Sequence, residues 1–195
     1  MLTAGLGLKV GLIQWCIVST PEQRLADLQR TAVRELMRVA PVIDEVGRRF
    51  AKAGHSIALV GGSVRDALLG RLSDSFDLDF ATSARPDEIE RCLTGWVDAT
   101  WDIGREFGTI GARIGVKQLE ITTYRADSYQ ATSRKPAVAF GDSLLGDLAR
   151  RDFTVNAMAL ELGNPASGSR EFVDPFGGQH DLAAGVLRTP ATPEE

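Results

Sequence analysis

The stretch "LVGGSVRDALLGR" at residues 59–71, followed by "DLDFAT" at residues 77–82, decides the fold expected for this chain. An apolar run, two glycines and an amphipathic segment predict a strand over 57–60 and a helix over 63–69. The alternation of apolar and charged residues predicts a second strand over 76–82. A glycine-rich turn therefore lies between two strands, and the second strand carries paired carboxylates.

The second strand presents an acidic face. Side chains alternate along a strand, so Leu78 and Phe80 face the core together with Phe76. Asp77 and Asp79 lie on the opposite face, roughly 6.6 Å apart. Carboxylates held this close repel one another, and a divalent cation relieves the repulsion; oxygen ligands favour magnesium over zinc. The alternative is a solvated acidic face on an edge strand, which needs no metal.

The glycine turn has the features of an anion site. Gly61 and Gly62 lie where free backbone N–H groups favour a phosphate, and Arg65 follows one turn later. The sequence "VGGSVRD" at 60–66 lacks the lysine of a P-loop, and "GLGLKVG" at 5–11 has the wrong spacing for a dinucleotide fingerprint. The usual ATPase and dehydrogenase interpretations therefore fail. The alternative is a tight connection without a ligand.

A third carboxylate follows the same pattern in "QLEITTY" at residues 118–124. Leu119 and Ile121 point to one face of the expected strand, and Glu120 points to the other. Two strands can then bring three carboxylates together. The alternative is that Glu120 is only the exposed residue of a hairpin.

The remaining elements follow from helical and strand spacings. Two helices are expected over 21–39 and 41–53, because Pro41 suits the first position of a helix and Gly54 suits a helix end. Further along, the pattern predicts a helix over 86–93, strands over 109–114 and 117–124 joined by a hairpin at Gly115, a long mobile loop over 125–143 and a helical turn over 144–151.

Length and composition limit the class of protein. With 195 residues, 44% of them hydrophobic, the chain can bury one good core, or a core with an appendage. A formal charge of -4 gives no global basic surface, so contact with nucleic acid requires a local patch. Cys16 and Cys92 lack the spacing of a disulfide framework or a zinc site, which favours a reduced, cytoplasmic setting. Lys9 and Gln14 interrupt the apolar segment 2–18, so neither a membrane-spanning helix nor a secretory signal is expected.

Five segments occur in an order and spacing that resemble one known family: "LVGGSVRDALLG", "DLDFAT", "LEITTYR", "RRDFTVNAMAL" and "DPFGGQHDLAAGVLRTP". Together they resemble the head domain of bacterial class II tRNA nucleotidyltransferases, the CCA-adding enzymes and their poly(A) polymerase relatives. The resemblance covers roughly residues 55–195. It implies an α+β nucleotidyltransferase fold, a small mixed β-sheet with packed helices, preceded here by N-terminal helices. It also implies a head over 55–175 and a hinge with the start of a truncated neck over 176–195. Residues 1–54 carry no part of the resemblance and are expected to form an N-terminal extension with helices.

The resemblance assigns roles to residues within these segments. Asp77 and Asp79 would be catalytic and hold two magnesium ions, and Glu120 would occupy the third acidic position. The nucleotide-binding positions, which contact the triphosphate, the ribose or the primer end, are Gly62, Arg65, Arg150, Arg151, Asp152 and Asn156, beside Gly61 of the glycine turn.

The implied reaction is template-independent addition of CCA to the 3′ end of tRNA from CTP and ATP. One metal ion would activate the 3′-hydroxyl for attack on the α-phosphate, and the other would stabilise the leaving pyrophosphate. His55 and His180 are expected at the surface rather than as general bases. In the family, a motif in the neck selects the base, and it lies shortly beyond a stretch like "TPATPEE" at residues 189–195. We expect the chain to end before this motif, at Glu195.

Two alternatives stay open: the head of a poly(A) polymerase, and a nucleotide- or RNA-binding module without turnover. Glu106, in "IGREFGTI" at residues 103–110, favours CCA addition, because relatives that polyadenylate tend to carry a second basic residue there. No membrane partner is expected, and the sequence does not specify an oligomeric state.

Overall fold

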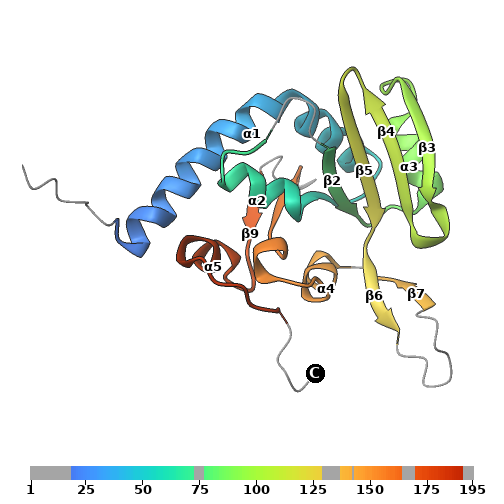
Figure 1. Cartoon of the computed structure of the whole chain (residues 1–195). Coiled ribbons are helices and arrows are strands. Elements are labelled where there is room, and N and C mark those ends of the chain that lie inside the picture. Colours follow the sequence, from blue (N-terminus) through green and yellow to red (C-terminus); the bar gives the residue numbers. More distant parts are fainter. Residues whose placement is uncertain (1–18, 73–76, 129–136, 142, 164–169, 191–195) are drawn as a thin grey trace, which may run out of the picture.

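The computed structural model describes residues 19–72, 77–128, 137–141, 143–163 and 170–190. The larger of its two sheets contains β1 (Ile57–Val60), β2 (Asp77–Thr82), β3 (Ala99–Gly104), β4 (Thr109–Ile114), β5 (Lys117–Thr123), β8 (Ala159–Leu162) and β9 (Glu171–Val173). These strands lie in the order β3-β4-β5-β2-β1-β8-β9; β2 and β5 are parallel and the other neighbours are antiparallel. A smaller sheet pairs β6 (Arg125–Ser128) with β7 (Ala137–Phe140) and extends from the end of β5 (Figure 1).

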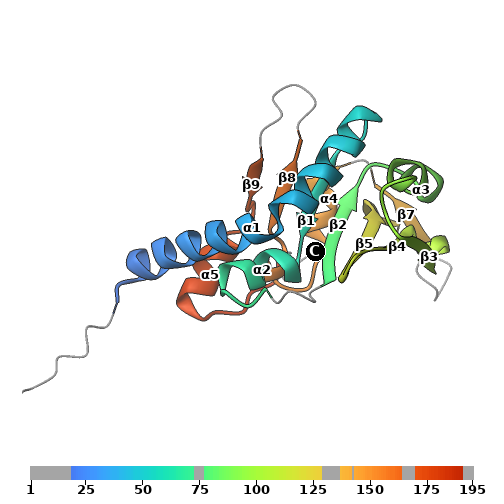
Figure 2. The ribbon, with the colours of Figure 1, turned by 90° about the horizontal axis from the view of Figure 1, so that it is seen from above.

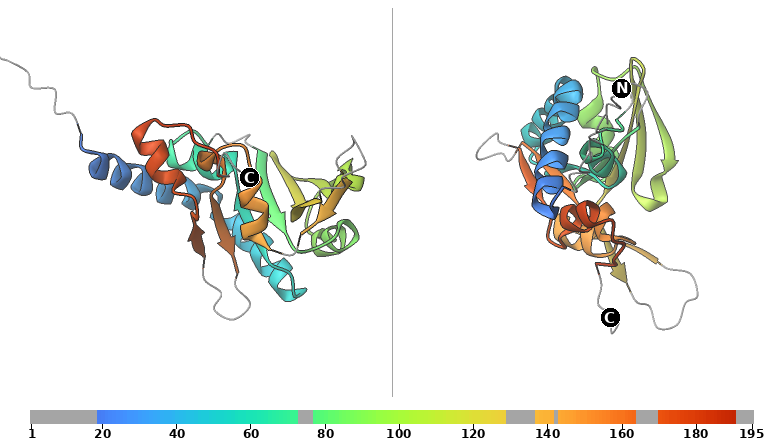
Figure 3. Two further views of the ribbon diagram at one scale, coloured as in Figure 1. Left: turned by 90° about the horizontal axis from the view of Figure 1, so that it is seen from below. Right: turned by 60° about the vertical axis from the view of Figure 1, so that its left-hand side comes forward.

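The helices are α1 (Pro21–Lys52), α2 (Gly62–Leu68), α3 (Pro86–Leu93), α4 (Leu144–Ala149) and α5 (Gly178–Ala184), with short 3₁₀ turns η1 (Arg105–Phe107) and η2 (Thr154–Asn156). Figure 2 shows the long helix α1 crossing over β1 and β8. Figure 3 shows α5 alongside the N-terminal part of α1. Arg24 joins these two helices, since its Nε donates a 2.9 Å hydrogen bond to the carbonyl oxygen of Ala183. No helix in the described part of the chain is long and apolar enough to cross a membrane.

The main core lies between one face of the larger sheet and the helices α1, α2 and α3. Helix α1 contributes Ile43, Val46 and Phe50, each 0% exposed, at helical spacing. The residues that pack with them include Leu59 and Phe80 from the sheet, Val64 and Leu68 from α2, and Ile89 and Leu93 from α3. Helix α1 therefore belongs to the same core as the strands that carry the predicted site.

The opposite face of the sheet is covered only in part. A smaller apolar cluster near α4 includes Ala58, Val60, Ala81, Leu148 and Ala159. Beyond this cluster, the same face carries polar or exposed side chains on β2, β5, β4 and β3. These side chains build the site described in the next section.

One continuous helix replaces the two helices predicted over 21–39 and 41–53, so that prediction is wrong. Pro41 cannot donate a hydrogen bond to the Met37 carbonyl, but both residues are exposed, so water can satisfy that oxygen. The apolar stripe of the helix crosses the proline without a break, through Ala32, Val39, Ile43, Val46 and Phe50. Burial of this stripe holds the helix together across Pro41.

Other predicted elements have mixed outcomes. The predictions for β1, α3 and β4 are confirmed to the residue, and the hairpin at Gly115 is confirmed. The prediction of a long loop over 125–143 is wrong in part, because residues 125–128 and 137–140 pair as β6 and β7. Residues 129–136 and 142 of this predicted loop lie outside the described residues. So does Phe76, the first residue of the strand predicted over 76–82. The elements β3, β8, β9 and α5 have no counterpart in the sequence prediction. Ladder hydrogen bonds join backbone groups, which side-chain composition alone does not reveal.

Truncating the core face of α1 should cost much more stability than truncating its outer face. Phe50→Ala should lower the free energy of unfolding by about 3–5 kcal/mol, because the Phe50 ring is 0% exposed. Val33→Ala, on the same helix but 65% exposed, should change it by less than about 0.5 kcal/mol. Urea denaturation followed by circular dichroism measures both. Equal losses would contradict the place of α1 in the core.

Candidate active site

Parallel pairing of β2 with β5 brings two acidic residues side by side. Asp79 is the direct register partner of Glu120, so both side chains lie on the same face of the sheet, on strands about 4.8 Å apart. Asp77 lies on this face two residues earlier and is exposed. The residues between and beside them that face the core are Leu78 and Phe80, both 1% exposed, and Leu119 and Ile121, both 0% exposed.

This arrangement raises the pKa of Asp79 from 3.8 to about 6. Burial is the largest cause, and the negative charge of Glu120 is the next. Asp77 adds to the shift, whereas the positive charge of Arg151 opposes it. Burial and the neighbouring carboxylates therefore disfavour the ionised form of Asp79, and a further cation beside it would stabilise that form.

Ser63 fixes the start of α2 against β2. The Ser63 hydroxyl accepts a 3.0 Å hydrogen bond from the Asp79 N–H and donates a 3.3 Å hydrogen bond to the Asp77 carbonyl oxygen. Ser63 is 0% exposed, and a Cβ placed on Gly62 would lie 3.9 Å from Asp79 Oδ2. The glycine turn therefore lies directly beside the acidic pair. The sequence analysis missed Ser63, for which the only signal is its place after two glycines at a helix start.

Two arginines from distant segments meet at Asn156. Arg65 Nη1 donates a 2.6 Å hydrogen bond to Asn156 Oδ1, across 91 residues of sequence, and Arg65 also pairs with Asp66 at 3.0 Å. Arg151 Nη1 donates a 3.4 Å hydrogen bond to the Asn156 carbonyl oxygen. The same guanidinium forms an ion pair with Asp147 at 3.1 Å. Both arginines are therefore held in place by protein groups.

Gly61 makes room for Arg151. Its φ of +65° is in the region that favours glycine, and a Cβ there would lie 2.5 Å from Arg151 Nη1. The Nε of Arg151 is buried and has no hydrogen-bond partner among the described residues. Buried donors are normally satisfied. The guanidinium therefore lies against the glycine turn with one buried donor group unpaired among the described residues.

Asp152 and Arg150 flank Arg151 and have different surroundings. Asp152 is exposed, and its Oδ1 accepts hydrogen bonds from Asn156 Nδ2 at 3.0 Å and from the Phe153 N–H at 2.8 Å. The bond from Asn156 is the largest cause that lowers the pKa of Asp152. Asp152 therefore orients Asn156. Arg150 is exposed and lines the cleft described next.

A cleft of about 320 Å³ lies over the acidic pair. Its lining residues are Asp79, Phe80, Ala81, Glu120, Thr122, Arg125, Asp147, Arg150 and Arg151. Three carboxylates and three guanidinium groups thus share this lining. The predicted residues Gly61, Gly62, Arg65, Asp77, Asp152 and Asn156 lie around the cleft rather than in its lining. A larger cavity of about 610 Å³ lies on the helix-covered side of the sheet and is lined by none of the predicted site residues.

The sequence analysis also missed Asp147 and Arg125. Asp147 is 5% exposed and accepts a 3.2 Å hydrogen bond from the Arg125 N–H besides its ion pair with Arg151. Arg125 Nη2 donates a 3.2 Å hydrogen bond to Thr109 Oγ1. The contacts of Arg125 with Asp147 and Thr109 join separate segments, so no local spacing signals them. The ion pair of Asp147 with Arg151 has an i, i+4 spacing, which is a local signal that the sequence analysis did not use. His55 lies 3.9 Å from Glu88 and is absent from the lining of the cleft.

The donor groups can be compared with the needs of a metal ion. Among the residues that the structure describes, no group of three His, Cys, Asp or Glu side chains is placed to hold a metal by itself. Asp79 and Glu120 nevertheless form an adjacent carboxylate pair. Magnesium typically binds through one or two carboxylates together with water and substrate phosphate oxygens. The donor set therefore fits magnesium shared with a phosphate ligand better than magnesium in an all-protein cage.

Comparisons with known proteins agree in one family. The family described as "Poly A polymerase head domain" matches residues 57–188 of this chain. The CCA-adding enzyme of Bacillus velezensis is 39% identical over 163 residues, which are 83% of this chain and 37% of that protein. The CCA-adding enzyme of Enterococcus faecalis is 40% identical over 166 residues, which are 85% of this chain and 37% of that protein. The chain thus spans about 37% of the length of these relatives.

Solved structures give the same result. The Bacillus stearothermophilus CCA-adding enzyme in complex with CTP superposes with a TM-score of 0.55 and 31% identity, over 88% of this chain and 34% of that one. A CCA-adding enzyme in complex with ATP superposes with a TM-score of 0.65 and 27% identity, over 85% of this chain and 37% of that one. The predicted nucleotidyltransferase fold is therefore confirmed. With the match over residues 57–188, these similarities show that the chain belongs to the poly A polymerase head domain family.

Proposed function

We propose that this chain is the catalytic head of an enzyme that adds CCA to the 3′ end of tRNA, using CTP and ATP. The observation that carries the proposal is the acidic pair Asp79 and Glu120 facing the guanidinium groups of Arg150 and Arg151 across one cleft. Carboxylates for a divalent cation and arginines for phosphates are the two needs of nucleotidyl transfer. Support also comes from the CTP and ATP complexes of the similar CCA-adding enzymes.

Asp77, Asp79 and Glu120 are the residues proposed to hold magnesium. Magnesium bound there supplies Lewis-acid stabilisation of the negative charge that develops on the reacting phosphate. Burial of Asp79 beside Glu120 prepares the site, because the unfavourable charge of the pair favours a cation. Ser63 holds the β2 backbone between Asp77 and Asp79, so both carboxylates keep their spacing.

Arg151 and Arg65 are proposed to bind the triphosphate. Arg151 lines the cleft beside the glycine turn, and its guanidinium is a suitable donor to a phosphate oxygen. Asn156 links the two arginines, and Asp152 orients Asn156. We expect these side chains to contact the phosphates and the sugar of the nucleotide. Both groups are common to CTP and ATP, so this part of the site does not select a base.

The alternative function is polyadenylation, as the family description suggests. The relatives reported above are CCA-adding enzymes, and Glu106 is acidic where polyadenylating relatives tend to carry a second basic residue. CCA addition is therefore the better-supported proposal. The cytoplasmic setting belongs to the same proposal and rests on the cysteine content alone. Extension of a tRNA that lacks its CCA, with either CTP and ATP together or ATP alone, separates the two activities.

Asp79→Asn should give a protein that is more stable but inactive. The folded protein raises the pKa of Asp79 to about 6, so wild-type stability falls as pH rises from about 4 to 6, and an asparagine avoids that loss. With EDTA present, the free energy of unfolding of the variant relative to that of wild type should increase by about 1–2 kcal/mol as the pH rises from 4 to 7, after allowance for the partial exposure of Asp79. Magnesium-dependent nucleotide transfer should disappear. Glu106→Gln, which removes an exposed charge, is the control and should change stability little at either pH.

Arg151→Ala should weaken binding of CTP and ATP by the same factor, about 10- to 100-fold, because a phosphate contact carries no base information. Arg65→Ala should behave alike. Isothermal titration with each magnesium nucleotide measures the effect. Arg91→Ala, on α3 and outside the cleft lining, is the matched control and should bind both nucleotides like wild type. A loss confined to one nucleotide would contradict the phosphate role.

Residues 1–195 alone should bind magnesium CTP and magnesium ATP with similar dissociation constants. Base selection requires hydrogen-bonding groups at the base edge, and in this proposal the charged groups of the cleft lining bind the metal ion and the phosphates instead. Extension of tRNA by this chain alone should be inefficient, since its net charge of -4 provides no broad surface for an RNA backbone. Strong selection of CTP, or ordered addition of C, C and A, would contradict this division of labour.

A further inference from the structure

The open face of the sheet carries an exposed tryptophan in line with the acidic pair. Register pairs Trp101 with Gly111, Gly111 with Glu120, and Glu120 with Asp79, so the row crosses β3, β4, β5 and β2. Residues paired in this way point to the same face of a sheet. Trp101 therefore lies on the face of the carboxylates, whereas its neighbour Asp102 lies on the other.

Gly111 allows the indole to lie flat across β4. A Cβ on Gly111 would lie 2.5 Å from both Cε2 and Nε1 of Trp101, and 2.8 Å from Cδ1 of Ile103. The ring therefore leans over the glycine toward Glu120, one strand away. Trp101 remains 36% exposed and Ile103 remains 45% exposed. An aromatic face is thus presented to solvent beside the acidic pair.

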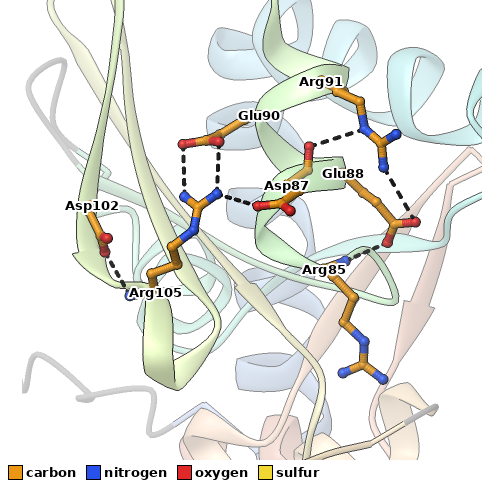
Figure 4. Close-up of polar contacts among 7 residues, drawn as sticks. All are labelled: Arg85, Asp87, Glu88, Glu90, Arg91, Asp102 and Arg105. Carbon is orange, nitrogen blue, oxygen red and sulfur yellow. Dashed lines mark hydrogen bonds and ion pairs between the residues drawn. The ribbon is translucent and has the colours of Figure 1, made fainter.

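The strand that bears Trp101 is anchored from the opposite side of the sheet. Figure 4 shows Arg105, just after β3, between α3 and the strand. The guanidinium of Arg105 forms ion pairs with Glu90 at 3.1 Å and with Asp87. The backbone N–H of Arg105 donates a 2.7 Å hydrogen bond to Asp102 Oδ1. The end of the edge strand is therefore held, which limits the movement of the indole.

The position of Trp101 indicates which group it would contact. The glycine turn and Arg65 lie on the β1 side of Asp79, and Trp101 lies on the β3 side. In phosphoryl transfer the attacking and leaving oxygens lie roughly in line on opposite sides of the phosphorus. If pyrophosphate leaves toward the glycine turn, the RNA 3′ end approaches from the side of β4 and β3.

We propose that Trp101 stacks on the 3′-terminal base of the RNA and so positions its hydroxyl over the acidic pair. An exposed aromatic face binds any base, and stacking of this kind is independent of sequence. Arg113, exposed two residues beyond Gly111 on the same strand face, adds a cation for the RNA backbone. This inference rests on the proposed function. It makes Trp101 a positioning residue for RNA and assigns it no part in nucleotide binding.

The test uses residues 1–195 and two six-nucleotide RNAs that carry a 5′ fluorescent label. One RNA ends in CC, and the other has an abasic 3′-terminal residue. Trp101→Leu keeps an apolar side chain without a π face, Trp101→Phe keeps an aromatic ring, and Val116→Ala is a control at a site 76% exposed. Fluorescence anisotropy gives the dissociation constant for RNA, and circular dichroism checks that each variant folds.

Trp101→Leu should weaken binding of the CC-ended RNA about 5- to 100-fold, Trp101→Phe should restore most of the affinity, and Val116→Ala should match wild type. The abasic RNA should bind all four proteins equally weakly. The dissociation constant for magnesium CTP should stay unchanged in every variant. Equal binding of the CC-ended RNA by wild type and Trp101→Leu, or a loss of CTP affinity in Trp101→Leu, would overturn the role of Trp101 while leaving the proposed function intact. A wild-type chain that binds neither magnesium CTP nor RNA would overturn both.

Discussion

The parallel pairing of β2 with β5 is the constraint on which the rest of the structure depends. It places Asp79 and Glu120 in one register pair, where two carboxylates repel and burial makes the repulsion stronger. A protein tolerates such a pair only if other contacts hold the two strands in register. Here the reverse faces of the same strands supply those contacts, with Leu78 and Leu119 almost fully buried.

The carboxylates and guanidinium groups of the cleft nearly balance in charge, yet their arrangement is preorganised to bind a ligand. Arg65 and Arg151 are held by Asp66, Asp147 and Asn156, so little side-chain freedom remains to be lost when a phosphate binds. Arg151 is still close enough to the acidic pair for its charge to lower the pKa of Asp79. The network around Asn156 therefore fixes the two arginines beside the acidic pair while they keep protein partners of their own.

Sequence patterns predict those parts of this structure that depend on local periodicity. The alternation in "DLDFAT" and "QLEITTY" is sufficient to assign core and open faces on β2 and β5, and the glycine turn marks the start of α2. Pro41 misleads a local analysis, because the continuity of α1 depends on an apolar stripe buried against distant strands. The predicted site residues are close together in the structure, but their roles stay predictions. Contacts such as Arg65 with Asn156, or Asp147 with Arg125, join segments that no spacing rule connects. Trp101 gains its significance only from strand register, and Ser63 gains its significance from hydrogen bonds to the backbone of β2.

Helix α1 has a consequence for the order in which the chain can fold. Its N-terminal part contacts α5, and the hydrogen bond from Arg24 to Ala183 spans 159 residues. Synthesis delivers α1 first, whereas β8 and α5, two of its partners, arrive last. The central strand β1 likewise waits for β8 before its second edge is paired. Pairing of segments this far apart slows folding, because the chain loses the conformational entropy of a large loop before the stabilising contacts between the segments form. During synthesis the parts of α1 that pack on β8 and α5 would therefore stay exposed until those elements have left the ribosome, which makes the nascent chain dependent on protection from aggregation.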